Sequence, residues 1–163
     1  NHFSNSGKTI NDYLPSFWKF KYVYVLPYNV KQNEVIDEFA LRKFEIPHET
    51  EFLIIYTGFG NFRKTKVYWN NNPGLSPSLA KNLKSKCPNL RVVGFDFISL
   101  SSYQNRVLGR IAHKEFLIEN DILIVEDMNL SGIQNRRIKS VTALPLQIDK
   151  IDGSPITIIA DYE

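Results

Sequence analysis

The chain has 163 residues, 43% of them hydrophobic and 23% charged, a size and composition that predict one soluble globular domain over 1–163. The net charge of +3 is too small to indicate a nucleic-acid partner, and the most basic run, 136–139, is interpreted as a solvated loop face. No stretch approaches the roughly 18 apolar residues of a membrane span, and the single cysteine, Cys87, with no secretory signal, favours a reducing, cytoplasmic location.

Strand patterns are frequent along the chain. Six segments are rich in β-branched, aromatic or aliphatic residues and predict strands. They are 21–28, 52–56, 90–98, 122–125, 141–148 and 156–160. Between the last two, Asp152-Gly153-Ser154-Pro155 predicts a hairpin or tight turn. The fold class expected is therefore α+β, with mixed β-sheets and a few helices.

Helix patterns are fewer. Residues 35–44 are compatible with a short helix or with a strand and a loop. Ser76-Pro77 is a helix start, because an N-cap hydroxyl precedes a proline at the first helical position. Cys87-Pro88 ends that helix. Leu79, Ala80 and Leu83 supply its apolar face.

A third helix is predicted over 104–119. Its apolar face consists of Val107, Leu108, Ile111 and Ala112. His113 projects from the other side of that stripe, and Gly109 lies one turn before it on the same face. Because glycine has no side chain, we expect room for an ion or a substrate beside the imidazole.

Glu126 closes the apolar strand 122–125, thirteen positions after His113. A carboxylate at the end of a buried strand is costly unless a cation or several donors meet it. Imidazole and carboxylate together suit a divalent transition metal such as zinc or manganese. The alternative interpretation is a hydrogen-bonded histidine and an ordinary strand-end carboxylate with no metal.

Seven segments carry a resemblance to a known family. They are Asn1-His2-Phe3, the run 7–12, the strand 52–59, Tyr68 with Asn72-Pro73-Gly74-Leu75, the G-x-D-x-x-S segment 94–99, His113 with 126–130, and 143–146 with 152–155. In this order they resemble the putative cyclase family of metal-dependent hydrolases, which includes kynurenine formamidase (arylformamidase) and isatin hydrolase. The chain departs from the family pattern at Phe59, where the family has tryptophan, and at Asn72, where it has histidine.

The resemblance implies a swivelling β/β/α domain and a set of site residues. His2 would be the general acid/base, and His113 and Glu126 would be metal ligands, with Glu126 able to bridge two ions. The remaining ligands of the family belong to an H-x-G-T-H-x-D segment, which we expect to precede Asn1 in a longer protein. The metal would be zinc or manganese. The assembly would be a homodimer or a larger homo-oligomer.

The resemblance implies hydrolysis of an amide or formamide bond in a small-molecule substrate, as in kynurenine formamidase and tryptophan catabolism. His2 would carry a proton between water and the leaving nitrogen. Phe3 and Trp18 are candidates for substrate contacts, with a plain core role as the alternative. Two other enzymatic functions of the same family remain open: hydrolysis of a cyclic imide or isatin-type ring, and polyketide-type cyclisation. A third alternative is a non-catalytic binding module that has kept the fold.

Overall fold

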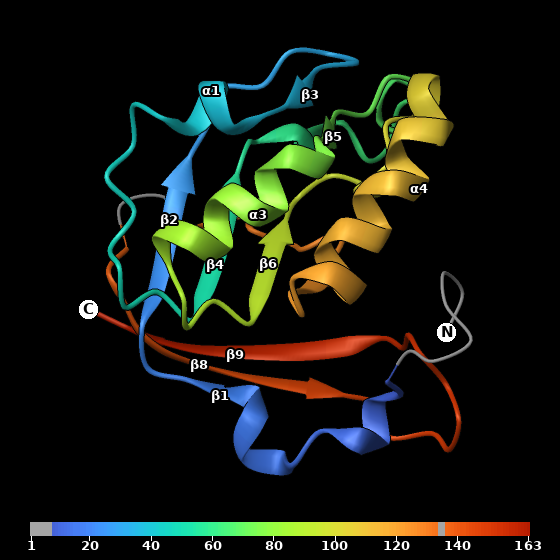
Figure 1. The fold of residues 1–163 in the computed structure, drawn as a ribbon. Coiled ribbons are helices and arrows are strands. Elements are labelled where there is room, and N and C mark those ends of the chain that lie inside the picture. Colours follow the sequence, from blue (N-terminus) through green and yellow to red (C-terminus); the bar gives the residue numbers. More distant parts are fainter. Residues whose placement is uncertain (1–7, 134–135) are drawn as a thin grey trace.

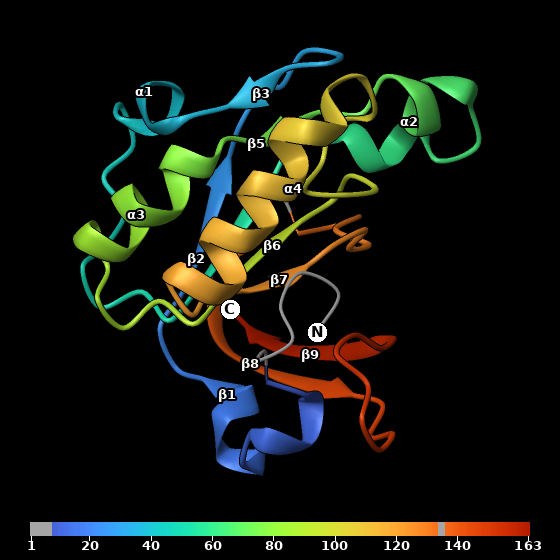
Figure 2. The ribbon, with the colours of Figure 1, turned by 45° about the vertical axis from the view of Figure 1, so that its right-hand side comes forward.

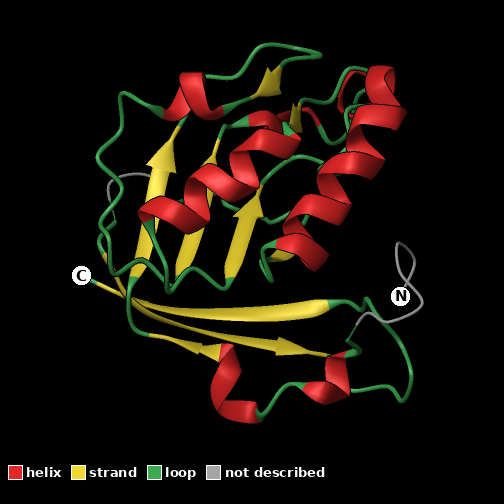
Figure 3. Cartoon of the chain, in the orientation of Figure 1, coloured by secondary structure: helices red, strands yellow, loops and turns green. Residues whose placement is uncertain are grey.

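The computed structural model describes residues 8–133 and 136–163, and its strands form three sheets (Figures 1 and 3). Four parallel strands lie in the order β2-β4-β6-β7, three antiparallel strands in the order β1-β8-β9, and β3 pairs with β5. The strands are β1 (Lys19–Phe20), β2 (Val23–Pro27), β3 (Val35–Ile36), β4 (Phe52–Tyr56), β5 (Gly74–Leu75), β6 (Val92–Phe95), β7 (Leu123–Val125), β8 (Ile138–Pro145) and β9 (Ile156–Tyr162).

The helices gather mainly on one face of the parallel sheet. Figure 1 shows α3 in front of β4 and β6, with α4 beside it. The α-helices are α1 (Glu38–Leu41), α2 (Lys66–Asn70), α3 (Pro77–Lys86) and α4 (Arg106–Lys114). A π-helical turn, Glu115–Glu119, continues α4, and short 3-10 turns lie at Ile10–Asp12, Pro15–Trp18, Phe59–Phe62 and Tyr103–Asn105.

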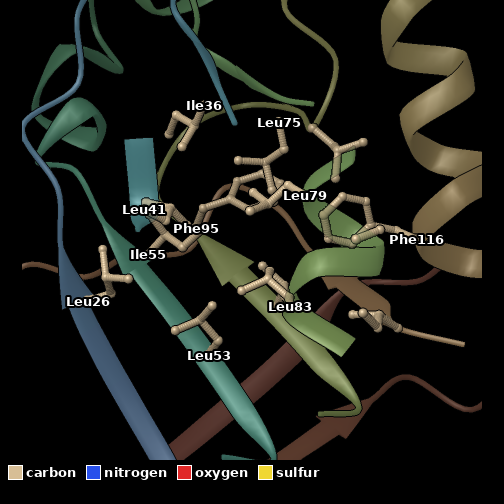
Figure 4. Packing of buried hydrophobic residues seen from close by; sticks show 14 of the residues in the cluster. Leu26, Ile36, Leu41, Leu53, Ile55, Leu75, Leu79, Leu83, Phe95 and Phe116 are labelled. Carbon is tan, nitrogen blue, oxygen red and sulfur yellow. The ribbon is translucent and has the colours of Figure 1, made fainter. Parts of the chain in front are cut away.

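The parallel sheet is the middle layer of the molecule. Successive residues of β4 alternate between two separate cores: Leu53 and Ile55 pack with the helices, and Phe52 and Ile54 pack against the antiparallel sheet. This follows from the two-residue period of a strand, because both of its faces are covered. Figure 4 shows the helix-side core, in which residues of β2, β4 and β6 meet α3.

The predicted fold class is confirmed, since the molecule is α+β with few helices. Parallel and antiparallel strands are segregated into separate sheets. Each predicted strand is present, although β8 both begins and ends three residues before the predicted 141–148. The segment 152–155 lies in the longer connection between β8 and β9, not in a two-residue turn, and Leu146 N donates to Pro155 O there.

The predicted helix starting at Ser76 is also confirmed: α3 has Ser76 as its N-cap and Cys87 as its C-cap, and it buries its apolar face. The segment 35–44 contains both of the alternatives, because β3 is followed directly by α1. No helix within the described ranges is long and apolar enough to cross a membrane.

The helix predicted over 104–119 is present, but its predicted apolar face is only partly right: Ala112 is buried and Leu108 half-buried, as expected, and the other two residues are exposed. Val107 is 75% exposed and Ile111 is 49% exposed, whereas Gly109, Ala112 and Phe116 are buried. Periodicity identified the helix, but the side that faces the sheet is the one with the smallest side chains. A glycine and an alanine allow the helix to approach the loop that follows β6.

Candidate functional site

His113 and Glu126 lie together near the carboxyl-terminal edge of the parallel sheet. Glu126 follows the last residue of β7, and His113 occupies the last turn of α4. The imidazole Nε2 is 3.6 Å from the carboxylate Oε1. Ligand and catalytic groups in open α/β sheets concentrate at this edge, where the strands end. The structure therefore brings together the two residues that the sequence singled out.

The Glu126 carboxylate is held by the loop that follows β6. Its Oε1 accepts hydrogen bonds from Leu100 N at 2.7 Å and from Ser99 Oγ at 3.1 Å. The side chain is 36% exposed. Because two donors already orient the carboxylate, its position is set before any ligand arrives.

The His113 ring is oriented by a backbone carbonyl. Nδ1 lies 2.8 Å from Gly109 O, and since a carbonyl can only accept, Nδ1 carries the proton. In the neutral ring, Nε2 is then the nitrogen with a lone pair, and it faces the Glu126 carboxylate. Two acceptors that face each other favour a cation or a proton between them, as in metal sites where the second ring nitrogen is anchored.

Two opposing effects act on the His113 pKa. Burial alone would lower it, but contact with the Glu126 carboxylate and the hydrogen bond to Gly109 outweigh burial, and the pKa lies above its usual range. The site therefore attracts positive charge to the imidazole.

The space beside Gly109 is filled by protein, contrary to expectation. A Cβ at Gly109 would lie 2.1 Å from Ser101 Oγ and 2.8 Å from Ser101 Cα. Ser101 Oγ is also 3.3 Å from His113 Nδ1. Gly109 thus makes room for Ser101, which packs against the imidazole, and not for an ion.

Asp127, next to Glu126, stabilises the loop after β7. Its backbone has a positive φ of 53°, a conformation that costs free energy in a residue other than glycine. Its Oδ1 accepts hydrogen bonds from Tyr68 OH and from Arg63 Nε. Arg63 Nη2 also donates to the carbonyls of Asp127 and Met128, at 3.0 and 2.7 Å. These bonds hold the turn that presents Glu126.

Tyr68 matches the family tyrosine noted in the sequence and is almost completely buried. Burial and the hydrogen bond to Asp127 both raise the pKa of its hydroxyl. Tyr68 therefore remains protonated at neutral pH and acts as a donor to the Asp127 carboxylate.

A cavity of about 710 Å³ lies beside the pair, and both His113 and Glu126 line it. Its volume is in the range of small-molecule sites. Tyr13 and Trp18 contribute aromatic surface, with their ring centroids 5.7 Å apart and edge to face. Burial, with the nearby charge of Asp121, raises the pKa of Tyr13 to about 12. The rest of the lining combines aliphatic side chains with polar and charged ones, among them Lys8, Asp127 and Asp152.

Trp18 was interpreted either as a substrate contact or as a plain core residue, and its position is compatible with both. It is 7% exposed and packs in the core beneath the antiparallel sheet, and it also lines the cavity. Its indole Nε1–H is buried and meets no acceptor among the residues that the structure describes. The other predicted substrate contact, Phe3, and the predicted acid/base, His2, lie outside the described residues.

The pair suits a divalent ion in both chemistry and spacing. Two donors about 2.0–2.2 Å from one tetrahedral ion lie about 3.3–3.6 Å apart, close to the 3.6 Å observed. Among residues 8–133 and 136–163, however, no group of three or more His, Cys, Asp or Glu side chains could hold a metal. The spacing of His113 and Glu126 thus fits an ion, but the described residues add no third donor to the pair.

Several residues around the pair had escaped the sequence reasoning. Arg63 and Asp127 are 64 positions apart, so no local sequence pattern indicates that their side chains form a hydrogen bond. Ser101 could have been suspected from Gly109, since a glycine inside an amphipathic helix often marks the close approach of another segment. The backbone donor Leu100 N has no side-chain signature at all.

No family profile matches the sequence, and no curated protein matches it. The fold is similar to isatin hydrolase A from Labrenzia aggregata bound to benzyl benzoate, with a TM-score of 0.74 and 15% identity, over 96% of this chain and 66% of that one. Isatin hydrolase A from Ralstonia solanacearum gives a TM-score of 0.72 and 14% identity, over 96% and 65%. The chain thus spans slightly less than two thirds of these relatives. The cyclase-like fold is confirmed, whereas membership of the kynurenine formamidase-like family stays a prediction.

Proposed function

We propose that the protein is a metal-dependent hydrolase of a cyclic amide fused to, or bearing, an aromatic ring. The observation that carries the proposal is the His113–Glu126 pair at the wall of the 710 Å³ cavity. The similarity of the fold to two isatin hydrolases supports it, because isatin is a cyclic amide. The sequence had favoured an open-chain formamide, and the cyclic alternative now has the better support.

His113 Nε2 and Glu126 Oε1 would hold the ion, which supplies Lewis-acid polarisation of the carbonyl and a more acidic water. The anchored Nδ1–H of His113 keeps Nε2 directed at the ligand position. Leu100 N and Ser99 Oγ keep Glu126 in place. Further ligands are required, and in the family pattern they come from an H-x-G-T-H-x-D segment.

The cavity wall would place the substrate. Tyr13 and Trp18 present aromatic surface against a planar ring. Hydrolysis adds water across the C–N bond: oxygen joins the carbonyl carbon, and a proton goes to the leaving nitrogen. His2 is the proposed carrier of that proton.

The test combines metal analysis with hydrolysis of two substrates by the purified full-length protein. We expect bound zinc or manganese, and faster ring opening of isatin than hydrolysis of N-formylkynurenine. His113→Ala and Glu126→Gln should each lower metal content, and activity by at least 100-fold, whereas His48→Ala, at an exposed histidine, should change neither. Unchanged metal content in both site variants would remove the pair from the centre.

A non-catalytic binding module is the second candidate. The absence of a three-donor group from the described residues is the observation that favours it. Full-length protein that binds no divalent metal at micromolar concentration and opens no ring would support this candidate against the hydrolase.

A further inference from the structure

A second hollow, of about 440 Å³, shares only His113, among the described lining residues, with the 710 Å³ cavity, which we call the amide cavity. It is bounded by α2, by the loop after β6 and by the first turns of α4, and Figure 2 shows α2 beside that end of α4. Trp69, Tyr103, Arg106 and Arg110 line it together with His113. The function proposed above makes no use of this hollow.

Its positive charge lies at two arginines. No aspartate or glutamate is among the described residues that line the hollow, although Glu126 contacts two of them, Ser99 and His113. Arg106 and Arg110 lie one turn apart on α4, and neither forms an ion pair within the described part of the chain, whereas Arg63 and Arg91 each reach a carboxylate within 3.0 Å. Two like charges at this spacing repel each other, so an anion between them would relieve a cost that the fold carries. A guanidinium pair is well suited to carboxylate oxygens.

Its wall is aromatic and accessible. Trp69 is 56% exposed and Tyr103 is 47% exposed, so a ligand can reach both rings from solvent. The Arg106 guanidinium lies over the Tyr103 ring, 4.8 Å from its centre, so the two are stacked and together form one surface at the wall of the hollow. A planar ligand can stack on this surface while its charge meets the arginines.

The hollow is built on a rigid frame. Asn72, which is 1% exposed, accepts from Tyr103 N on its side-chain oxygen at 3.0 Å and from Ser102 Oγ on its carbonyl at 3.1 Å. Its Nδ2 donates to Ser101 O at 2.9 Å. The loop that carries Tyr103 is thereby tied to the end of α2, which carries Trp69. Such preorganisation reduces the entropy lost on binding.

We propose that this hollow is a binding site for a small planar aromatic carboxylate, separate from the amide cavity. The ring stacks against Trp69 and the Tyr103–Arg106 surface, and the carboxylate pairs with Arg106 and Arg110. The site requires no metal, so it stands or falls independently of the hydrolase proposal.

The two tryptophans of the chain provide the test, since Trp18 lines the amide cavity and Trp69 lines the hollow. In the Trp18→Phe variant, Trp69 is the remaining tryptophan of residues 1–163 and reports on the hollow. Titration of the metal-stripped full-length protein with phthalate should change its fluorescence saturably. In the Trp69→Phe variant, the same titration should leave Trp18 emission unchanged.

Substitutions in the Trp18→Phe background identify the groups that bind. Arg106→Gln and Arg110→Gln should each weaken phthalate binding at least tenfold, and Arg106→Lys should weaken it less. Arg136→Gln is the matched control, because Arg136 is a cation over an aromatic ring, Tyr162, that does not line the hollow. Circular dichroism checks the folding of each variant.

Three results would overturn the proposal. The first is no saturable change in Trp69 fluorescence, and the second is an affinity for phthalate in both arginine variants that equals that of the Trp18→Phe parent. The third is binding of the neutral analogue phthalamide as tight as that of phthalate. Metal content and isatin hydrolysis, measured without phthalate, report separately on the function proposed above. Loss of phthalate binding with metal and activity retained would therefore reject this site alone.

Discussion

Helices α3 and α4 cover the same face of the parallel sheet, yet they are attached to it differently (Figures 1 and 2). α3 packs on β4 and β6 through large aliphatic side chains, and Leu79 and Leu83 are at most 1% exposed. α4 approaches through Gly109 and Ala112, and it leaves Val107 and Ile111 in solvent. One helix is held by buried area, and the other by close backbone approach.

The difference follows from the task of each helix. α3 lies over the middle of the sheet, where large side chains fill the core. α4 must bring His113 to Glu126, and a helix reaches the loop after β6 only where its side chains are small. A helix can therefore leave part of its apolar surface exposed while another of its sides packs closely enough to place His113 beside Glu126.

The largest expected effect lies in α3. Leu79→Ala should reduce the free energy of unfolding by about 2–5 kcal/mol, because it opens a cavity in a fully packed core. Chemical denaturation measures the loss, with Ser85→Ala, at an exposed position of the same helix, as the control. A loss below about 1 kcal/mol would show that α3 is not held by buried area.

A smaller effect is expected where α4 approaches the loop. Gly109→Ala should destabilise the protein by about 1–2 kcal/mol, since the added methyl overlaps Ser101, although alanine is the better helix former. Gly153→Ala, which meets no atom within 4 Å, is the matched control. Combination with Ser101→Gly should recover part of the loss in a double-mutant cycle, and strict additivity would argue against the contact.

The smallest effect is expected on the exposed side of α4. Val107→Ala and Ile111→Ala should each change the free energy of unfolding by no more than about 0.5 kcal/mol. Denaturation at two protein concentrations tests this directly. A loss above about 1 kcal/mol that grows with concentration would mean that another copy of the chain covers these residues.

Much of the secondary structure was predictable because it depends on local chemistry. The proline after Ser76 and the Cys87-Pro88 pair mark the ends of α3. The apolar run 52–56 corresponds to β4 without error. These signals act within a few residues, so no tertiary contact is needed to interpret them.

The candidate site was predictable only in part. A histidine on a helix and a glutamate closing an apolar strand stood out as residue types, and the fold places them 3.6 Å apart. Gly109 O, which orients His113, is a backbone atom. Leu100 N and Ser99 Oγ, which orient Glu126, lie in a loop 26 and 27 residues before it. Hydrogen bonds of that kind leave no spacing pattern in the sequence.

The amino-acid sequence by itself determined where helices and strands form, and which two side chains had the chemistry to share an ion. Tertiary structure alone decided which side of α4 is buried, what occupies the space at Gly109, and how Arg63 and Tyr68 hold Asp127. The physical reason is range. Capping, turn preference and periodicity act along the chain, whereas packing and hydrogen bonding join residues that only the complete fold brings within a few ångströms of each other.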